Sequence, residues 1–304
     1  MSPPRKTTRK ASAKPTTRKI TARLLQSWPL PDPNDGDSKE DRGRVLVIGG
    51  SVQIPGAALL AGIAALRAGA GKLQVATAAE AALAMAIALP EAKVIGLRTD
   101  GHGAIRELGR EASRDARDAD AVLVGPGMDP TAATRRIVDN IIAATRCTLV
   151  LDAGALHPSA ARVFKRRNGD ATMIMTPHIG EMAAMLDTDE ATIAATPEAI
   201  AREFAQAWGV VLALKGPTTY IAAPDGSVWI NTAGSCGLGT SGSGDVLAGL
   251  IAGLAARGAP ADQATVWGVH LHAQAGARLS RRMGLVGFLA REISDEIPAL
   301  MHGL

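Results

Sequence analysis

Short apolar runs and longer stretches of helical periodicity alternate along the chain from residue 44 onward. The short runs are apolar at consecutive positions and rich in Val, Ile and Leu, which is typical of strands buried on both faces of a parallel sheet. They predict strands at residues 45–48, 73–77, 93–97, 121–124, 148–151, 173–176 and 210–214. The Ala-rich stretches repeat their apolar positions every three to four residues and predict helices. These helices are expected at residues 56–68, 78–88, 131–144, 179–186, 197–208, 245–257, 261–282 and 290–300.

Strands that alternate with helices predict an α/β fold, a three-layer sandwich in which helices cover both faces of a mostly parallel sheet. The pattern changes in the segment TYIAAPDGSVWI, where Asp225 and Gly226 separate two runs of alternating polarity. This segment predicts a β-hairpin, which we expect to close one edge of the sheet. No shift in composition and no repeat divides residues 43–304, and we interpret them as a single domain.

The overall composition is that of a globular protein with a large aliphatic core. Of the 304 residues, 47% are hydrophobic and only 3% are aromatic. No apolar stretch reaches the roughly 18 residues of a membrane-spanning helix, so we expect no membrane association. The two cysteines, Cys147 and Cys236, can build neither a disulfide framework nor a four-cysteine zinc site, which favours the cytoplasm.

The positive charge is concentrated at the N-terminus. Eight of the Lys and Arg residues lie within the first 23 positions, before any acidic residue, and the whole chain carries only +4. The remainder is therefore mildly acidic, at about −4, and we expect no nucleic-acid partner. The basic segment is also poor in apolar residues and contains several prolines, which predicts a disordered tail over residues 1–22 and a lead-in over residues 23–42.

Several common sites are excluded by their spacing. The chain has no G-x-x-x-x-G-K-[ST] motif, and the glycines from Gly49 to Gly56 do not fit G-x-G-x-x-G. A P-loop NTPase is therefore excluded, and a Rossmann dehydrogenase is disfavoured. His270 and His272 are two residues apart on a predicted helix, so their rings diverge and cannot share a metal ion. We interpret both as ordinary packed or surface histidines.

The strongest local signal is GTSGSGD at residues 239–245, directly before the apolar helix VLAGLIAGL. A Gly/Ser-rich loop that enters a helix presents successive backbone N–H groups and the positive helix end, which together favour a phosphate. Asp245 at the helix start has two interpretations. It is an N-cap, or it is a base that accepts a proton from a substrate hydroxyl beside a transferable phosphate.

Several segments together resemble one family. They are GRVLVIGGSVQIPGAALLAGIAALRAGAGKLQVAT (residues 43–77), LPEAKVIG (89–96), VGPGM (124–128), TPHIGEMAAML (176–186), LKGPTTYIAAPDG (214–226) and NTAGSCGLGTSGSGDVLAGLIAG (231–253). In this order they are similar to the ADP/ATP-dependent NAD(P)H-hydrate dehydratases of the ribokinase-like superfamily. The resemblance implies a ribokinase-like fold and a repair reaction. Hydrated NADH or NADPH is phosphorylated on its ring hydroxyl by ADP or ATP with Mg²⁺, and phosphate then leaves.

The resemblance also implies residue roles. Asp245 would be the base, and the amides of Gly242 and Gly244 would stabilise the transferred phosphoryl group. The hydrated nicotinamide nucleotide would contact Ala57, Gly127, His178 and Asp245. The donor nucleotide would contact Lys215, Gly216, Pro217, Thr218, Thr219 and Gly244. Glu181 would hold Mg²⁺ through water. From the residues alone, Lys215 is equally an ordinary charge at a strand end, and His178 is equally a helix cap.

The chain departs from the family pattern at three positions. Gly154 stands where the family usually has Asp, and Ser241 and Ser243 replace the usual Gly and Thr of the anion loop. The N-terminal epimerase domain common in the family does not fit into residues 1–42, so an epimerase would be a separate protein. The resemblance further implies a homo-oligomer, a tetramer. Two other functions stay open: a vitamin-precursor kinase of the same fold, and a non-catalytic nucleotide-binding protein whose basic tail binds RNA or an acidic partner.

Overall fold

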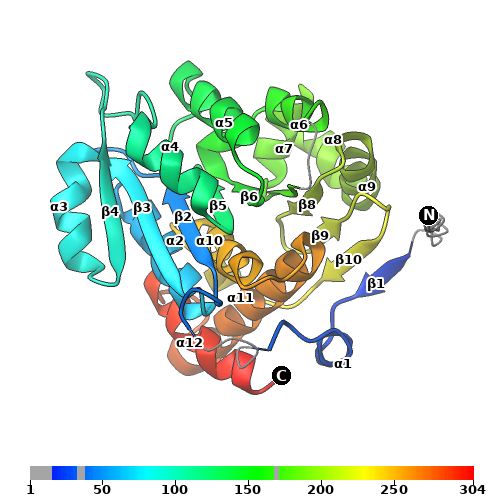
Figure 1. Ribbon diagram of the computed structural model, residues 1–304. Helices are drawn as coiled ribbons and strands as arrows, with labels where there is room; N and C mark the ends of the chain where they lie inside the picture. Colours follow the sequence, from blue (N-terminus) through cyan, green and yellow to red (C-terminus); the bar gives the residue numbers. More distant parts are fainter. Residues whose placement is uncertain (1–15, 33–37, 168–170) are drawn as a thin grey trace, which may run out of the picture.

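The computed structural model describes residues 16–32, 38–167 and 171–304. One sheet of ten strands, in the order β1-β10-β9-β8-β7-β6-β5-β2-β3-β4, runs through it (Figure 1). The strands are β1 (Thr17–Lys19), β2 (Arg44–Ile48), β3 (Lys72–Ala78), β4 (Ala92–Leu97), β5 (Ala121–Val124), β6 (Thr148–Leu151), β7 (Met173–Met175), β8 (Val211–Leu214), β9 (Thr219–Ala222) and β10 (Val228–Asn231). β2 to β8 are mutually parallel, whereas β9 is antiparallel to both β8 and β10.

Helices cover both faces of this sheet, which confirms the predicted three-layer α/β fold (Figure 1). One face is packed by α2 (Gly56–Arg67), α10 (Ser243–Ala256), α11 (Ala261–Met283) and α12 (Ala290–His302). The other face is packed by α4 (Gly109–Asp118), α5 (Ala132–Ala144), α6 (Pro158–Lys165), α7 (Ile179–Leu186), α8 (Glu190–Ala195) and α9 (Pro197–Trp208). Two further helices are α1 (Ala22–Gln26), which buries Leu25, and α3 (Ala79–Ala88) beside β4.

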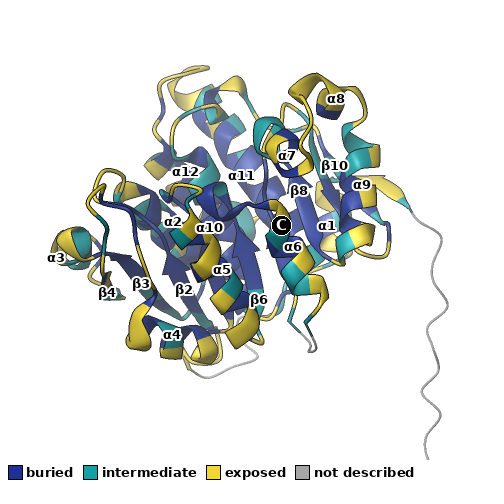
Figure 2. Cartoon of the chain, turned by 90° about the horizontal axis from the view of Figure 1, so that it is seen from above, coloured by how far each residue is buried: buried dark blue, intermediate teal, exposed yellow. Residues whose placement is uncertain are grey.

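Alternate side chains of a strand point to the two faces, so each central strand contributes to two apolar cores. In β2, Val45 and Val47 join the core under α2 and α10, while Leu46 and Ile48 join the core under α4 and α5. All four side chains are fully buried. Figure 2 shows the central strands as buried and the outer surfaces of the helices as exposed. This burial on both faces explains the uninterrupted apolar runs of the sequence.

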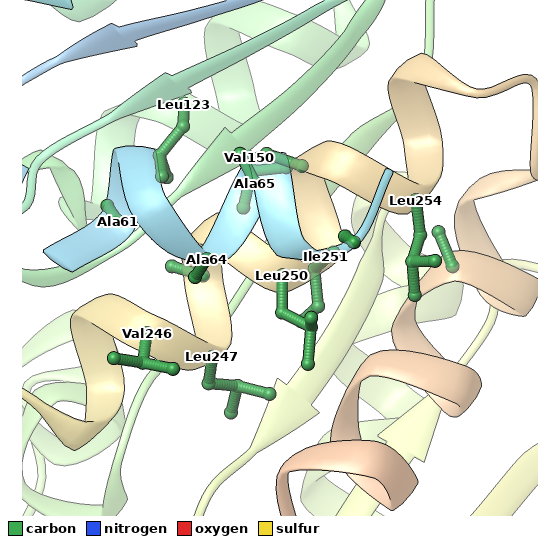
Figure 3. Close-up of a cluster of buried hydrophobic side chains, with 14 of the residues drawn as sticks. Ala61, Ala64, Ala65, Leu123, Val150, Val246, Leu247, Leu250, Ile251 and Leu254 are labelled. Carbon is green, nitrogen blue, oxygen red and sulfur yellow. The ribbon is translucent and has the colours of Figure 1, made fainter. Parts of the chain in front are cut away.

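Helices α2 and α10 pack closely in the core (Figure 3), and glycine makes this possible. A Cβ atom at Gly249 would lie 2.1 Å from the carbonyl oxygen of Ala61, and one at Gly253 would lie 2.5 Å from that of Ala65. Larger residues at either position would push the helices apart. The N-terminus of α10 is thereby held beside the first turns of α2, where Gly242 lies against Leu60.

The N-terminal segment corrects two expectations. Residues 17–19 form the edge strand β1, which pairs with β10, so the β9–β10 hairpin forms as predicted but does not close the sheet edge. The backbone N–H of Ile20 donates to the carbonyl oxygen of Ile230 at 2.9 Å. The prediction of disorder is therefore wrong for residues 16–22, because the open edge of β10 offers unpaired backbone groups and the Thr17 hydroxyl bonds to Glu198 and Arg202 on α9. Residues 1–15 lie outside the described residues.

Four helices were not predicted from the sequence: α1, α4, α6 and α8. α4 is mostly charged and buries only Ala112, Asp115 and Ala116, so its apolar stripe is too narrow for a periodicity argument. Within the described part of the chain, no helix is both long and apolar enough to cross a membrane.

Candidate active site

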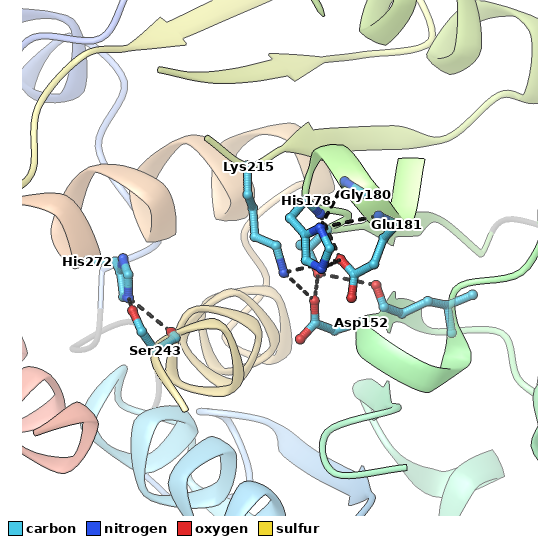
Figure 4. A network of polar contacts seen from close by, with 9 residues as sticks. Asp152, His178, Gly180, Glu181, Lys215, Ser243 and His272 are labelled. Atoms are coloured by element: carbon cyan, nitrogen blue, oxygen red, sulfur yellow. Dashed lines mark hydrogen bonds and ion pairs between the residues drawn. The ribbon is translucent and has the colours of Figure 1, made fainter. Parts of the chain in front are cut away.

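The candidate site lies at the carboxyl ends of the central parallel strands. Asp152 directly follows β6, the segment from Thr176 to His178 follows β7, and Lys215 follows β8. In a parallel sheet these ends share one edge, so chemistry-bearing side chains from distant parts of the sequence meet there. Figure 4 shows Asp152, His178, Glu181 and Lys215 pointing toward one another at this edge.

Asp152 and Lys215 form the centre of the site. The Nζ atom of Lys215 lies 2.8 Å from Oδ1 of Asp152, and the hydroxyl of Thr176 donates to the same oxygen at 2.7 Å. The Asp152 side chain is only 3% exposed, and that of Lys215 is 19% exposed. Burial lowers the pKa of Lys215, but the carboxylates of Asp152 and Glu181 outweigh it, and the pKa is raised overall. Lys215 is therefore a fixed cation and not an ordinary exposed charge at a strand end.

His178 and Glu181 form a capping box at the start of α7. Nδ1 of His178 accepts from the N–H groups of Gly180 and Glu181 at 3.0 and 3.2 Å. Oε2 of Glu181 accepts from the N–H of His178 at 2.7 Å and lies 3.9 Å from Nζ of Lys215. The capping interpretation of His178 is therefore correct. Its ring is 60% exposed and remains accessible to a ligand.

The loop before α10 has the geometry expected of an anion site. Gly242 is the N-cap of α10 and has a φ of +87°, in the left-handed region that favours glycine. A Cβ atom there would also lie 2.5 Å from the side chain of Leu60. Gly244 faces the charged centre, because a Cβ atom at this residue would lie 3.5 Å from Nζ of Lys215 and 3.9 Å from Oδ2 of Asp152. The amides at the N-terminus of α10 therefore lie beside the ion pair.

Asp245 is the third residue of α10, and no side chain caps this helix, so the N-cap interpretation of Asp245 is wrong. Burial raises the pKa of Asp245, and the carboxylate of Asp152 raises it further. Lys215 opposes the rise, and the pKa of Asp245 is about 6. A carboxyl group that titrates close to neutral pH is suited to take up a proton during a reaction.

Ala57 and Gly127 form a second group of predicted residues that lie together. Gly127 has a φ of +66°, and a Cβ atom there would lie 2.8 Å from that of Ala57 and 3.2 Å from Cα of Gly50. Gly50 in turn donates its N–H to the carbonyl oxygen of Pro126 at 2.7 Å. The loops after β2 and β5 are thus in contact at the first turn of α2, and side chains are excluded from Gly127.

The remaining predicted residues contribute a turn. Gly216, Pro217 and Thr218 connect β8 to β9, and Thr219 is the first residue of β9. Gly216 and Pro217 are exposed. Among the described residues, no hydrogen bond or ion pair links this turn to Asp245. The turn is connected to the charged centre through the backbone, because Gly216 directly follows Lys215.

The described residues contain no group of three or more His, Cys, Asp or Glu side chains placed to hold a metal ion. Two of the three acids at the site are engaged instead, Asp152 with Lys215 and Glu181 with the N-terminus of α7. This donor set does not fit a metal held by protein ligands alone. It does fit a Mg²⁺ ion that keeps most of its water and is carried by nucleotide phosphates.

Gly154 lies in a buried turn after β6. A Cβ atom at Gly154 would lie 2.1 Å from the carbonyl oxygen of Met128, and the preceding Ala153 has a φ of +47°. The backbone of this chain therefore has no space for an acidic side chain at this position. Asp152 is the carboxylate that this loop presents.

Sequence reasoning assigned no role at the site to Asp152, Thr176 or His272, and it named Ser243 only as a departure from the family pattern. Asp152 carried a usable signal, because an acid directly after a strand buried on both faces lies at the functional edge of a parallel sheet. Thr176 could have been inferred once Asp152 was placed, because its hydroxyl lies at the end of the neighbouring strand. His272 carried no local signal, since its partner Ser243 lies 29 residues earlier in the chain.

Comparisons with known proteins agree on one family. A family profile described as NAD(P)H-hydrate dehydratase matches residues 45–299. An ADP-dependent (S)-NAD(P)H-hydrate dehydratase of Xanthomonas campestris is 50% identical over 290 residues, which cover 95% of this chain and 98% of that protein. The bifunctional NAD(P)H-hydrate repair enzyme of Moorella thermoacetica is 36% identical, and the match covers 94% of this chain but only 54% of that enzyme.

Among solved structures, an ADP/ATP-dependent NAD(P)H-hydrate dehydratase from Bacillus subtilis, co-crystallised with ATP and Mg²⁺, superimposes with a TM-score of 0.80. It is 30% identical, and the superposition covers 94% of this chain and 98% of that one. A ribokinase-like superfamily protein from Enterococcus faecalis gives a TM-score of 0.78 at 26% identity. The predicted ribokinase-like fold is confirmed, and the chain belongs to the NAD(P)H-hydrate dehydratase family.

Proposed function

We propose that this protein restores the (6S)-hydrates of NADH and NADPH to the intact dinucleotides, with ADP or ATP as phosphoryl donor. The observation that carries the proposal is the position of Asp245. Its carboxyl group, with a pKa of about 6, lies at the start of an anion-binding helix beside the buried cation Lys215. This combination fits proton removal from a hydroxyl group that is being phosphorylated.

The reaction has two steps in this proposal. Asp245 accepts the proton of the ring hydroxyl while the hydroxyl oxygen attacks the terminal phosphorus of the donor. The donor is released with one phosphate fewer. The N–H groups of Gly242 and Gly244 stabilise the charge on the transferred phosphoryl group. The phosphate ester then breaks at the ring carbon and phosphate leaves. A proton lost from the neighbouring ring carbon restores the double bond of the dihydropyridine.

The two substrates occupy different sides of this centre in the proposal. The hydrated nicotinamide nucleotide lies against Ala57, Gly127 and His178, and its hydroxyl reaches Asp245. The close contact between Gly127 and Ala57 supports this, since it keeps side chains out of the region in front of α2. The donor lies against Lys215 and Gly244 and against the turn formed by Gly216, Pro217, Thr218 and Thr219.

Magnesium enters the proposal only with the donor. Glu181 would hold the ion through water, since its carboxylate faces Lys215 and is anchored by the N–H of His178. The ion would neutralise charge on the donor phosphates when bound. The residues of the chain supply the proton acceptor, the amides and the fixed cation.

The proposal also covers the cellular location, the oligomeric state and a partner enzyme. We place the enzyme in the cytoplasm, because Cys147 and Cys236 are both free cysteines. A homo-tetramer remains a prediction from the family resemblance. An epimerase that acts on the same hydrates likewise remains a prediction from the family resemblance.

Incubation of the purified protein with hydrated NADH and either ADP or ATP tests the function. Return of the absorbance band of reduced nicotinamide, with release of phosphate, is the expected result. Accumulation of a phosphorylated thiazole or pyrimidine alcohol, with no activity on the hydrate, would favour the vitamin-precursor kinase instead. Binding of nucleotide without any turnover would favour a non-catalytic protein. Parallel reactions with ADP and with ATP identify the donor.

A further inference from the structure

His272, on α11, contacts the anion loop from the side opposite to the charged centre. Its Nε2 atom lies 3.0 Å from the carbonyl oxygen of Ser243 and 3.1 Å from the Ser243 hydroxyl oxygen. Figure 4 shows His272 and Ser243 on one side of α10, and Lys215 and Asp152 on the other. His272 is 8% exposed and Ser243 is 5% exposed, so this contact is shielded from water. His272 is thus a buried polar group that the proposed reaction does not use.

The chemistry of the contact fixes the state of the ring. A carbonyl oxygen only accepts hydrogen bonds, so Nε2 must carry the proton and donate it. Burial lowers the pKa of His272 to about 4, so the ring is neutral, with the proton on Nε2. The Nε2–H group donates to the first residue of α10, between the left-handed Gly242 and the amide of Gly244.

We propose that His272 is a positioning residue for the reaction. Its hydrogen bond fixes the first turn of α10, so that the amides of Gly242 and Gly244 and the carboxylate of Asp245 are held at the reacting atoms. It touches neither substrate and acts only through Ser243.

The surroundings of the loop explain why such an anchor matters. On one side, Gly242 rests on Leu60 of α2, a contact between apolar atoms that has no directional preference. Among the described residues, the Ser243–His272 contact is the only hydrogen bond that joins this turn to another helix. A misplacement of about 1 Å in a catalytic group can cost about 10²-fold in rate. The turn therefore needs an anchor with a defined direction.

The test compares substitutions at two histidines of the same helix. His272→Leu removes the donor and keeps an apolar side chain, whereas His272→Gln places an amide N–H near the position of Nε2. His270→Leu is the matched control, because His270 is equally buried, at 6% exposure, and its Nδ1 has no hydrogen-bond partner. We expect His272→Leu to lower kcat by about 10- to 100-fold, with both Michaelis constants within about threefold of wild type. We expect His272→Gln to recover most of the activity and His270→Leu to retain it.

Three results would overturn the inference: a kcat of His272→Leu within twofold of wild type, an equal loss in His270→Leu, or no recovery in His272→Gln. If His272→Leu does not fold, His272→Asn replaces it, since its shorter amide does not reach Ser243, and the same comparison with His272→Gln decides.

The kinetic readout rests on the proposed function. Calorimetry with aluminium fluoride and AMP or ADP is therefore run as well, because it probes the anion loop without turnover. There, His272→Leu should weaken the fluoride-dependent gain in affinity about tenfold, and an unchanged gain overturns the inference even if no variant acts on the hydrate.

Discussion

Replacement of Asp245 by Asn is expected to abolish turnover and to stabilise the folded protein. The ordinary pKa of an aspartate is 3.8, and burial together with Asp152 raises that of Asp245 to about 6. Above pH 6 the folded protein must therefore keep a carboxylate ionised in surroundings that favour its protonated form. Asn cannot ionise and so does not carry this penalty. The same carboxyl group therefore supplies the base of the proposed reaction and lowers the stability of the folded protein.

The magnitude and the pH window follow from the two pKa values. A difference of about two pKa units corresponds to about 3 kcal/mol, which is an upper bound because Asp245 is only partly buried. Between about pH 4 and pH 6 the folded state binds more protons at this group than the unfolded state, so its contribution to stability falls as the pH rises. Above pH 6 the penalty is complete, and below pH 4 it is absent. Asp245→Asn should therefore be more stable than wild type by about 1–3 kcal/mol at pH 8 and unchanged near pH 4.

Urea unfolding of wild type and variant at pH 8 and at pH 4.5 measures this difference, because other titrating groups cancel between the two proteins. Asp118→Asn, at the exposed end of α4, serves as control and should show a much smaller gain at pH 8 than Asp245→Asn. A gain that is absent at pH 8, or equal at both pH values, would refute the argument that an ionised Asp245 is strained by its surroundings. Turnover near the wild-type rate would refute its role as the base.

The other predictions concern the loop after β6, the edge strand and the two halves of the site. Gly154→Ala should destabilise the fold by about 2–4 kcal/mol, since its Cβ would lie 2.1 Å from a carbonyl oxygen, whereas Gly101→Ala, in open space, should change the urea midpoint little. Deletion of residues 1–20 removes β1 (Thr17–Lys19) and its pairing with β10, so the melting temperature should fall, and an unchanged value would contradict the pairing. His178→Ala should raise the KM for the hydrate and spare that for the donor, and Lys215→Ala should do the opposite. The reverse pattern would mean that the two half-sites are exchanged.

The fold was predictable because its strands are buried on both faces. A segment such as VLVI at residues 45–48 has no polar position, and only the centre of a covered parallel sheet accommodates it. The edges were less predictable. β1 has the sequence TRK, and all three residues are exposed. It is held by backbone groups that β10 leaves open and by hydrogen bonds of the Thr17 hydroxyl to Glu198 and Arg202 on α9, neither of which a sequence pattern reveals.

The site was predictable where its signal is local and unpredictable where it depends on packing. The loop before α10 was found because glycines and an acid are adjacent in the sequence. The role of Asp245 was not decided by the sequence, since a cap and a base have the same residue type at a helix start. Position excludes the cap, because Asp245 is the third residue of a helix that no side chain caps. Burial raises its pKa, and the charges that raise it further belong to Asp152 after β6 and Glu181 on α7.

The charge balance of the site favours backbone amides over a second lysine for the proposed binding of the phosphoryl group. Lys215 is one cation among Asp152, Glu181 and Asp245, so the centre is negative when all three acids are ionised. A second lysine would attract the donor phosphates better, but it would also lower the pKa of Asp245 and weaken it as a base. Amides at a helix N-terminus attract an anion with only partial charges. In the proposed reaction they would therefore bind the phosphoryl group while the neighbouring carboxyl group keeps the raised pKa that a proton acceptor needs.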